Sequence, residues 1–198
     1  ISIPVTCPNR DGTCGYDGCV FCGEIGAGYE NLPASITVEQ QIAANKEHIG
    51  PKYKAEKFIP YFQNFSNTYL EPDRFRDYME AGCIDTTVGL AIATRPDCIN
   101  DTYLEILAKI KEKYGVDIYL EYGLQSVNYH TLEKINRGHG LAEFIDAVLR
   151  TKRYGFDVCA HMILNLPWDT EDDAFEGARI LSSLGIEQVK LHALYIVK

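Results

Sequence analysis

The sequence predicts an α/β fold, specifically a partial (β/α)6 TIM-type barrel with parallel strands. Two observations lead to this prediction. Apolar segments of strand length alternate with helical patterns throughout the 198 residues, and strands separated by helices pair in parallel through right-handed crossovers. A full barrel of eight such units takes about 250 residues, so six units in this length favour a partial barrel. An open doubly wound sheet is the competing arrangement.

Each expected strand is a short apolar run bounded by turn residues. The longest continuous run, TTVGLAIAT at 86–94, is typical of a buried strand. Pro60 weakens the second strand because proline cannot donate a ladder hydrogen bond. The six expected strands cover residues 1–5, 57–64, 86–94, 116–126, 156–167 and 188–197.

The expected helices carry recognisable start and stop signals. Thr37 is placed as an N-cap with Gln40 three residues later, which is a capping box. Pro72 lies in the first turn of the second helix and Gly82 at its end. Apolar residues at helical spacing give the third helix one buried face. The six expected helices cover residues 37–50, 71–82, 100–115, 128–136, 141–154 and 170–185.

Composition limits the classes of function. The net charge of −9 argues against non-specific nucleic-acid binding, which needs a basic face. No apolar stretch is long enough to cross a bilayer, and residues 1–7 do not resemble a secretory signal. We therefore expect a single cytoplasmic domain over 1–198 that has no membrane partner. Because the chain starts in one strand and stops in another, we expect it to be a fragment of a longer protein.

Four of the seven cysteines lie in one loop, CPNRDGTCGYDGCVFC at 7–22, directly after the first expected strand. Exposed structural thiols would oxidise there. A closed zinc site would use all four thiolates, but zinc ribbons bring two CxxC knuckles together and this loop has one. An iron–sulfur cluster is the third interpretation, and the spacing favours it over zinc. Zinc stays open as the alternative.

The stretch TCPNRDGTCGYDGCVFC resembles the radical S-adenosylmethionine superfamily. Within it, the chain is similar to the bacterial YhcC-like group, which is related to the elongator catalytic subunit and to oxygen-independent coproporphyrinogen oxidase. The resemblance implies that Cys7, Cys19 and Cys22 bind a [4Fe–4S] cluster. The usual family spacing is C-x3-C-x2-C, so the first gap is longer here, and Cys14 is interpreted as a bystander.

The resemblance also implies a reaction. The open fourth iron would bind S-adenosylmethionine, and an electron from a donor such as flavodoxin or ferredoxin would cleave its C–S bond. The resulting 5′-deoxyadenosyl radical would abstract hydrogen from a substrate that the resemblance does not identify. The chain would then be an oxidoreductase in which the cofactor carries the difficult chemistry.

Further polar residues fall at strand ends, where ligands gather in parallel α/β folds. Glycines that many members of the superfamily carry after the second strand are absent here, and polar side chains replace them. The resemblance implies that Phe21 packs near the adenine. A structural explanation stays open for several other positions: a turn for Gln63, Asn64 and Ser66, a helix cap for Arg137 and a core residue for His161. Glu121 inside an apolar strand implies a ligand or a basic partner. The expected cofactor-binding residues are Phe21, Gln63, Asn64, Ser66, Glu121, Gln125, Ser126, Arg137 and His161.

Two other functions remain open at this point. The first is a non-catalytic interaction module that binds zinc through all four loop cysteines. The second is a radical enzyme that modifies RNA, by analogy with the elongator subunit. Short basic clusters such as Lys109, Lys111 and Lys113 would then touch phosphates, although the acidic total does not favour nucleic acid as a partner.

Overall fold

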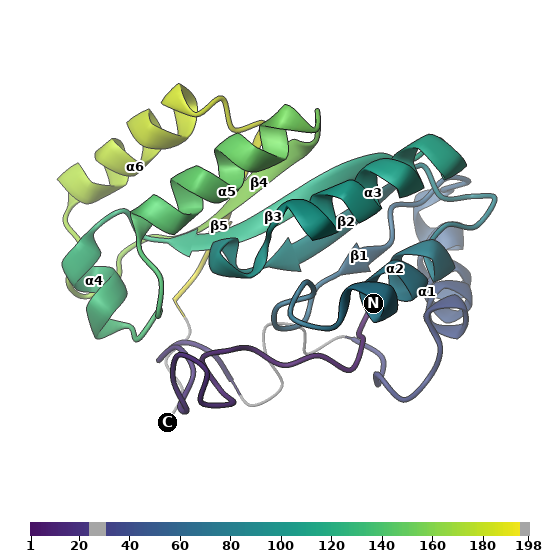
Figure 1. Ribbon diagram of the computed structural model, residues 1–198, viewed down its shortest axis with the longest axis horizontal. Coiled ribbons are helices and arrows are strands. Elements are labelled where there is room, and N and C mark those ends of the chain that lie inside the picture. Colours follow the sequence, from purple (N-terminus) through teal and green to yellow (C-terminus); the bar gives the residue numbers. More distant parts are fainter. Residues whose placement is uncertain (24–30, 195–198) are drawn as a thin grey trace.

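The computed structural model describes residues 1–23 and 31–194. Its centre is one parallel sheet in which five strands follow each other in sequence order, as Figure 1 shows. A doubly wound sheet would reverse the strand order partway across, so this order confirms the barrel-type arrangement. The strands are β1 (Tyr61–Phe62), β2 (Gly89–Thr94), β3 (Asp117–Gln125), β4 (Asp157–Ile163) and β5 (Gln188–His192).

Helices connect the strands, and α3 and α5 pack along one face of the sheet (Figure 1). Two of them begin with capping boxes at Thr37 and Thr170. None of the helices within the described residues has the length and hydrophobicity needed to span a bilayer. The helices are α1 (Val38–Tyr53), α2 (Pro72–Ala81), α3 (Asp101–Tyr114), α4 (Tyr129–Lys134), α5 (Leu141–Arg153) and α6 (Glu171–Ser183), with a short 3₁₀ turn η1 (Pro96–Cys98).

The first expected strand is not formed as a strand, and this is a correction to the sequence prediction. The main chain of Ile1 exchanges hydrogen bonds with the Tyr61 carbonyl and the Gln63 amide at 2.6 and 3.3 Å. The ladder then stops, because Pro4 lacks an amide hydrogen and the Val5 amide bonds to the Ile3 carbonyl. Residues 1–5 therefore lie beside β1 for one rung only.

The second expected strand, 57–64, shortens to the two residues of β1. Pro60 interrupts it, leaving Phe58 in an isolated bridge to Thr87. The last expected strand is formed at residues 188–192, and its predicted end at 195–197 lies outside the described residues. The strands β2 to β5 agree with the prediction in type and order.

The core lies between the sheet and the helices. All six residues of β2 are buried, and α3 contributes Leu104, Leu107 and Ile110 from one face. This packing holds the carboxyl ends of the strands in a fixed arrangement. Several non-glycine residues near these ends have left-handed backbone conformations, a strain that concentrates at functional sites. They are Phe65 (φ 57°), Gln125 (φ 80°), Asn136 (φ 53°) and Asn165 (φ 62°).

Candidate functional site

The cysteine loop has no helix or strand and is held by its own backbone hydrogen bonds. The amides of Cys14 and Gly18 bond to the carbonyls of Pro8 and Asn9 at 2.8 and 2.7 Å, and the Cys22 amide bonds to the Cys19 carbonyl at 2.9 Å. These bonds satisfy polar backbone groups that a helix or strand would otherwise pair. The loop therefore has a defined conformation despite its polar, glycine-rich sequence.

The segment after α4 anchors this loop. The Asn136 side chain donates to the Gly18 carbonyl at 2.8 Å, and the Asn9 side chain donates to the Asn136 carbonyl at 2.5 Å. The Val20 amide bonds to the Ile135 carbonyl at 3.1 Å. Two asparagines thus tie the cysteine loop to a segment more than a hundred residues away in sequence.

Three of the four loop cysteines line one cavity of about 230 Å³ at the carboxyl end of the sheet. Cys7 and Cys22 are partly buried and Cys19 is buried, whereas Cys14 is exposed and does not line the cavity. Six of the nine expected cofactor residues line the same cavity. They are Phe21, Gln63, Glu121, Gln125, Arg137 and His161.

The sulfur positions distinguish the two metal interpretations. In a tetrahedral zinc site with Zn–S bonds of 2.3 Å, the sulfurs lie about 3.8 Å apart. No three of the four loop cysteines, all of which are described, bring their sulfurs within 4.8 Å of one another. Three thiols spread around one cavity, with the fourth outside it, fit a multi-iron cluster with three protein ligands and argue against a closed four-thiolate zinc site.

Each of these three sulfurs lies near an arginine. The shortest nitrogen–sulfur distances are 3.4 Å from Arg10 to Cys22, 3.5 Å from Arg137 to Cys19 and 3.9 Å from Arg95 to Cys7. Burial raises the pKa of the Cys22 thiol, and the Arg10 guanidinium opposes that shift. Guanidinium groups favour the thiolate form, which is the form that binds metal.

Arg137 is fixed in place by β3. Its Nη2 and Nε donate to the Gly123 carbonyl at 2.6 and 3.2 Å. A β-bulge between Gly123 and Gln125 shifts the pairing of β3 with β4 there. A Cβ atom on residue 123 would lie 2.8 Å from both Arg137 Nη2 and Gln125 Nε2, so the glycine makes room for both side chains.

Glu121 is buried and has the basic partner that its position in an apolar strand requires. Lys190 on β5 donates to both carboxylate oxygens at 2.7 and 2.6 Å, and His161 on β4 lies 2.9 Å away. Burial alone would raise the pKa of Glu121, but hydrogen bonds from His161, Lys190 and Tyr61 lower it to about 2. The carboxyl group is therefore ionised.

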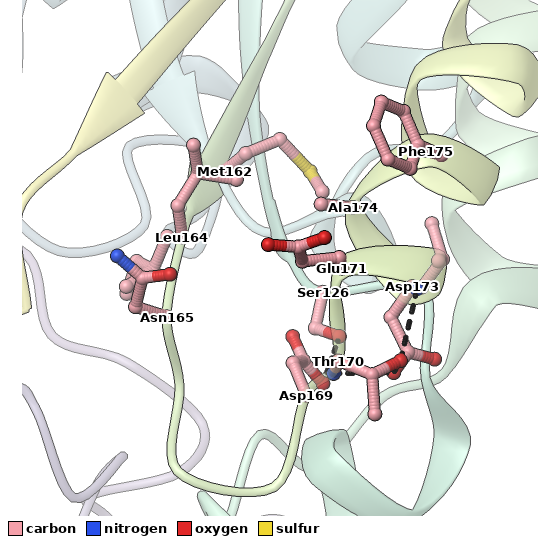
Figure 2. A pocket seen from close by; sticks show the side chains of 12 residues that line it. Ser126, Met162, Leu164, Asn165, Asp169, Thr170, Glu171, Asp173, Ala174 and Phe175 are labelled. Carbon is pink, nitrogen blue, oxygen red and sulfur yellow. Dashed lines mark hydrogen bonds between the residues drawn. The ribbon is translucent and has the colours of Figure 1, made fainter.

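The other three expected cofactor residues point elsewhere. Asn64 bonds to Ser2 and Asn31, and Ser66 is fully buried against Thr94. Ser126 bonds to Asp169 at 3.0 Å and lines a separate cavity of about 410 Å³ beside the start of α6 (Figure 2). None of these three side chains lines the cysteine cavity, and their predicted contact with a cofactor stays a prediction.

Sequence reasoning missed several residues of the site. Arg10 lies within the quoted cysteine loop, yet only the fold shows that it contacts Cys22. Lys190 and Tyr61 were read as strand residues, although both neighbour Glu121. An acidic residue inside a buried strand implies a basic partner, and alternation along the last strand is the one signal that could have suggested Lys190.

The chain matches known sequences over most of its length. A family model described as the Radical SAM superfamily matches residues 2–179. The chain is 35% identical to the protein YtqA of Bacillus subtilis over 193 residues (97% of this chain, 59% of that protein). It is 33% identical to protein YhcC of Escherichia coli K12 over 194 residues (98% and 61%). The chain thus spans about three fifths of the length of these relatives.

The chain is also similar to more distant relatives in sequence and to solved structures in fold. Elongator complex protein 3 of Saccharomyces cerevisiae is 29% identical over 122 residues, 54% of this chain and 21% of that protein. The fold matches coproporphyrinogen III oxidase (HemN) of Escherichia coli with a TM-score of 0.64 and 16% identity, covering 99% of this chain and 44% of that one.

The fold also matches that of Streptococcus suis SuiB bound to S-adenosylmethionine, with a TM-score of 0.63 and 17% identity, covering 100% of this chain and 40% of that one. At these identities the structures show the fold alone. The family itself is shown by the sequence match. The chain therefore belongs to the radical S-adenosylmethionine superfamily, which uses a [4Fe–4S] cluster and S-adenosylmethionine.

Proposed function

We propose that the protein to which this chain belongs is an enzyme that reductively cleaves S-adenosylmethionine to begin radical chemistry on a substrate. One observation carries the proposal: Cys7, Cys19 and Cys22 line a single cavity, and Cys14 does not. Three thiolates leave one iron of a cubane without a protein ligand. That open position is what distinguishes a catalytic cluster from a closed structural metal site.

The residues around the cavity have separable tasks in this proposal. Cys7, Cys19 and Cys22 hold the cluster, and Arg95, Arg137 and Arg10 place positive charge beside their sulfurs. Of the five N–H donors of Arg137, three contact Gly123 and Cys19. The other two are left to donate to an anionic group, such as the carboxylate of a bound amino acid.

Phe21 and Gln125 provide an apolar surface and an amide at the same cavity. When bound, the cluster and S-adenosylmethionine supply a 5′-deoxyadenosyl radical that removes a hydrogen atom from the substrate. Delivery of the electron requires a small redox protein such as flavodoxin or ferredoxin. Such chemistry requires that water be kept away from a reactive species that solvent would quench.

The direct test uses the full-length protein, prepared anaerobically. With its cluster it should be brown and contain about four irons and four sulfides. After reduction and incubation with S-adenosylmethionine, it should release 5′-deoxyadenosine. Its failure to do so when fully loaded with cluster would reject the catalytic proposal.

The cysteine variants separate the cluster from the zinc alternative. Cys14→Ala should keep the iron content and the colour, because Cys14 lies outside the cavity. Cys19→Ala should lose both. A colourless protein with one zinc ion, lost equally in the two variants, would support the four-cysteine interaction module instead.

A further inference from the structure

The cavity that the cysteines line also contains a chain of hydrogen-bonded side chains that cluster binding does not use. It runs from Lys190 on β5 to Glu121 on β3, then to His161 on β4, and ends at His192 on β5. The two histidine rings are 4.8 Å apart between centroids, with 3.1 Å between His161 Nδ1 and His192 Nε2. Both histidines line the cavity.

The strand register explains why these residues meet. Glu121 lies opposite Cys159, and His161 lies opposite Lys190, in adjacent parallel strands. Residues two apart on one strand point to the same face of a sheet. Cys159 and His161 therefore share the cavity face with Lys190 and His192, and the chain crosses three neighbouring strands.

The partners fix where the protons are. The Glu121 carboxylate can only accept, so the proton between it and His161 is on His161 Nε2. Lys190 pairs with the same carboxylate. With its proton on Nε2, the His161 ring accepts at Nδ1, and His192 donates to it from Nε2. This leaves a lone pair on His192 Nδ1.

A metal ion is the alternative use of this cluster. The ligand atoms of Glu121, Cys159 and His161 lie within 4.8 Å of one another. However, the Lys190 ammonium contacts both oxygens of the carboxylate, and burial raises the pKa of the Cys159 thiol to about 11. A site with a bound ammonium group and a protonated thiol does not suit a cation.

We propose that His192 is a proton-accepting catalytic residue of this cavity, and that His161 and Glu121 are positioning residues that hold its tautomer and balance its charge. The role of His192 as a base rests on the radical reaction proposed above, whereas the existence of the hydrogen-bonded chain is independent of that reaction. It implies a substrate that loses a proton as well as a hydrogen atom, such as one with a hydroxyl or amine group on the attacked carbon.

The proton step is self-contained. An O–H or N–H bond of the substrate radical breaks, and an N–H bond forms at His192 Nδ1. The unpaired electron stays on the substrate, so the step needs no oxidant or reductant. The imidazolium that forms is joined to the Glu121 carboxylate through His161. In hydrolytic triads the carboxylate contacts the histidine base directly, but in both arrangements its negative charge favours the imidazolium.

The surrounding titratable groups support a neutral base. His192 is exposed on β5, but partial desolvation, together with the nearby His161 and Lys190, lowers its pKa. Tyr61 on β1 stays protonated because burial and Glu121 raise the pKa of its hydroxyl, and its ring lies 4.2 Å from the Lys190 ammonium. Among the described residues, the charged and titratable groups that act on His192 are His161, Lys190 and Glu121.

The test is histidine NMR on the ¹⁵N-labelled full-length protein with its oxidised cluster, with His192→Gln used for assignment. At a pH above the pKa of His192, the rings of His161 and His192 should both carry their proton on Nε2. In Glu121→Gln the pKa of His192 should fall, because an opposite charge is lost. Glu176→Gln makes the same chemical change in the exposed pair with Arg179 on α6 and should leave His192 unaffected.

Two results would overturn the proposal: a proton on His192 Nδ1, or an equal shift in the two glutamine variants. If Glu121→Gln fails to fold, His161→Phe answers the same question, because removing the acceptor should yield a mixture of His192 tautomers, and an unchanged tautomer would count against the chain. Absence of 5′-deoxyadenosine from the wild-type protein would reject the radical reaction instead, so the two failures are distinguishable.

Discussion

Arg137 bridges the Gly123 carbonyl and the Cys19 sulfur, at 2.6 and 3.5 Å. A single side chain thus connects the bulged end of β3 to a residue of the cysteine loop. The same pattern recurs at Arg10, which contacts the Cys22 carbonyl at 3.1 Å and the Cys22 sulfur at 3.4 Å. The guanidinium groups therefore combine two effects, since they hold the loop and place positive charge at the sulfurs.

Replacing Arg10 with glutamine should lower the reduction potential of the cluster. Reduction adds negative charge to the cluster, and hydrogen bonds to its sulfurs stabilise that charge. Removing one donor and its positive charge should shift the midpoint by on the order of tens of millivolts. An EPR-monitored redox titration of the full-length protein measures this directly.

Arg74→Gln provides the matched control for this measurement. Arg74 is an exposed arginine of α2 that contacts Tyr78, away from the cysteines. Its removal should leave the midpoint unchanged. Equal midpoints for the Arg10 variant and the wild type would show that this arginine holds the loop without tuning the cluster.

A methyl group at position 123 should disturb the cofactor side of the cavity. In Gly123→Ala the new Cβ would meet Arg137 Nη2 and Gln125 Nε2 at 2.8 Å, so both side chains must move. We expect cluster content to be retained and S-adenosylmethionine to bind about tenfold more weakly, which corresponds to about 1.4 kcal/mol. Equilibrium dialysis with the labelled cofactor measures the affinity.

Gly50→Ala is the control for this glycine. Its new Cβ would have neighbours no closer than 3.8 Å, and residue 50 lies in α1. The affinity of this variant should match that of the wild type. If Gly123→Ala also binds normally, Arg137 and Gln125 have no part in holding the cofactor.

The fold could be predicted largely because hydrophobic periodicity is local information. The runs that became β2 to β5 alternate with amphipathic helices, and this alone predicts a parallel sheet. The errors fell at residues 1–5 and 57–64, where Pro4 and Pro60 limit the ladder to a few rungs. A short run of apolar residues does not reveal how many of its amides find partners.

The site could be predicted only in part. The resemblance of the cysteine loop implied Cys7, Cys19 and Cys22 as cluster ligands, and it could be seen in the sequence because those residues are close together in the chain. The partnership of Glu121 with Lys190 spans 69 residues and depends on strand register, which the sequence pattern does not provide. Asn64 and Ser66 were expected to contact the cofactor, but their side chains form hydrogen bonds within the protein. A polar residue at a strand end can therefore stabilise the local turn without binding a ligand.

Stability should depend on pH through Glu121. Its pKa is lowered from 4.5 to about 2 in the folded protein, so the unfolded state binds the proton more readily. The resulting stabilisation, up to about 3 kcal/mol, is fully present above pH 5 and is lost as the pH falls from about 4.5 toward 2. The difference in unfolding free energy between wild type and Glu121→Gln should therefore shrink in that range.

Urea unfolding of both full-length proteins at several pH values measures this difference. Glu176→Gln is a suitable control, because Glu176 forms an exposed pair with Arg179 on α6 that contributes little to stability. If the difference in unfolding free energy between wild type and Glu121→Gln stays constant from pH 7 to pH 3, Glu121 stabilises the sheet by packing and not by its charge.

Asn136→Asp should release the cysteine loop. The Asn136 side chain donates to the Gly18 carbonyl, whereas a carboxylate can only accept and would repel that oxygen. Aspartate tolerates the left-handed backbone of this position (φ 53°) nearly as well as asparagine, so the hydrogen bond is the main change. We expect less iron per protein after reconstitution and faster bleaching in air.

Asn100→Asp is the same chemical change at the N-cap of α3, where the side chain accepts from the Thr102 amide. Aspartate caps helices as well as asparagine does, so this variant should hold iron like the wild type. Iron and sulfide assays of the three proteins, reconstituted in parallel, measure the effect. If Asn136→Asp keeps its full complement of iron, the anchor between α4 and the loop is not needed to hold the cysteines in place, and the backbone bonds within the loop are sufficient.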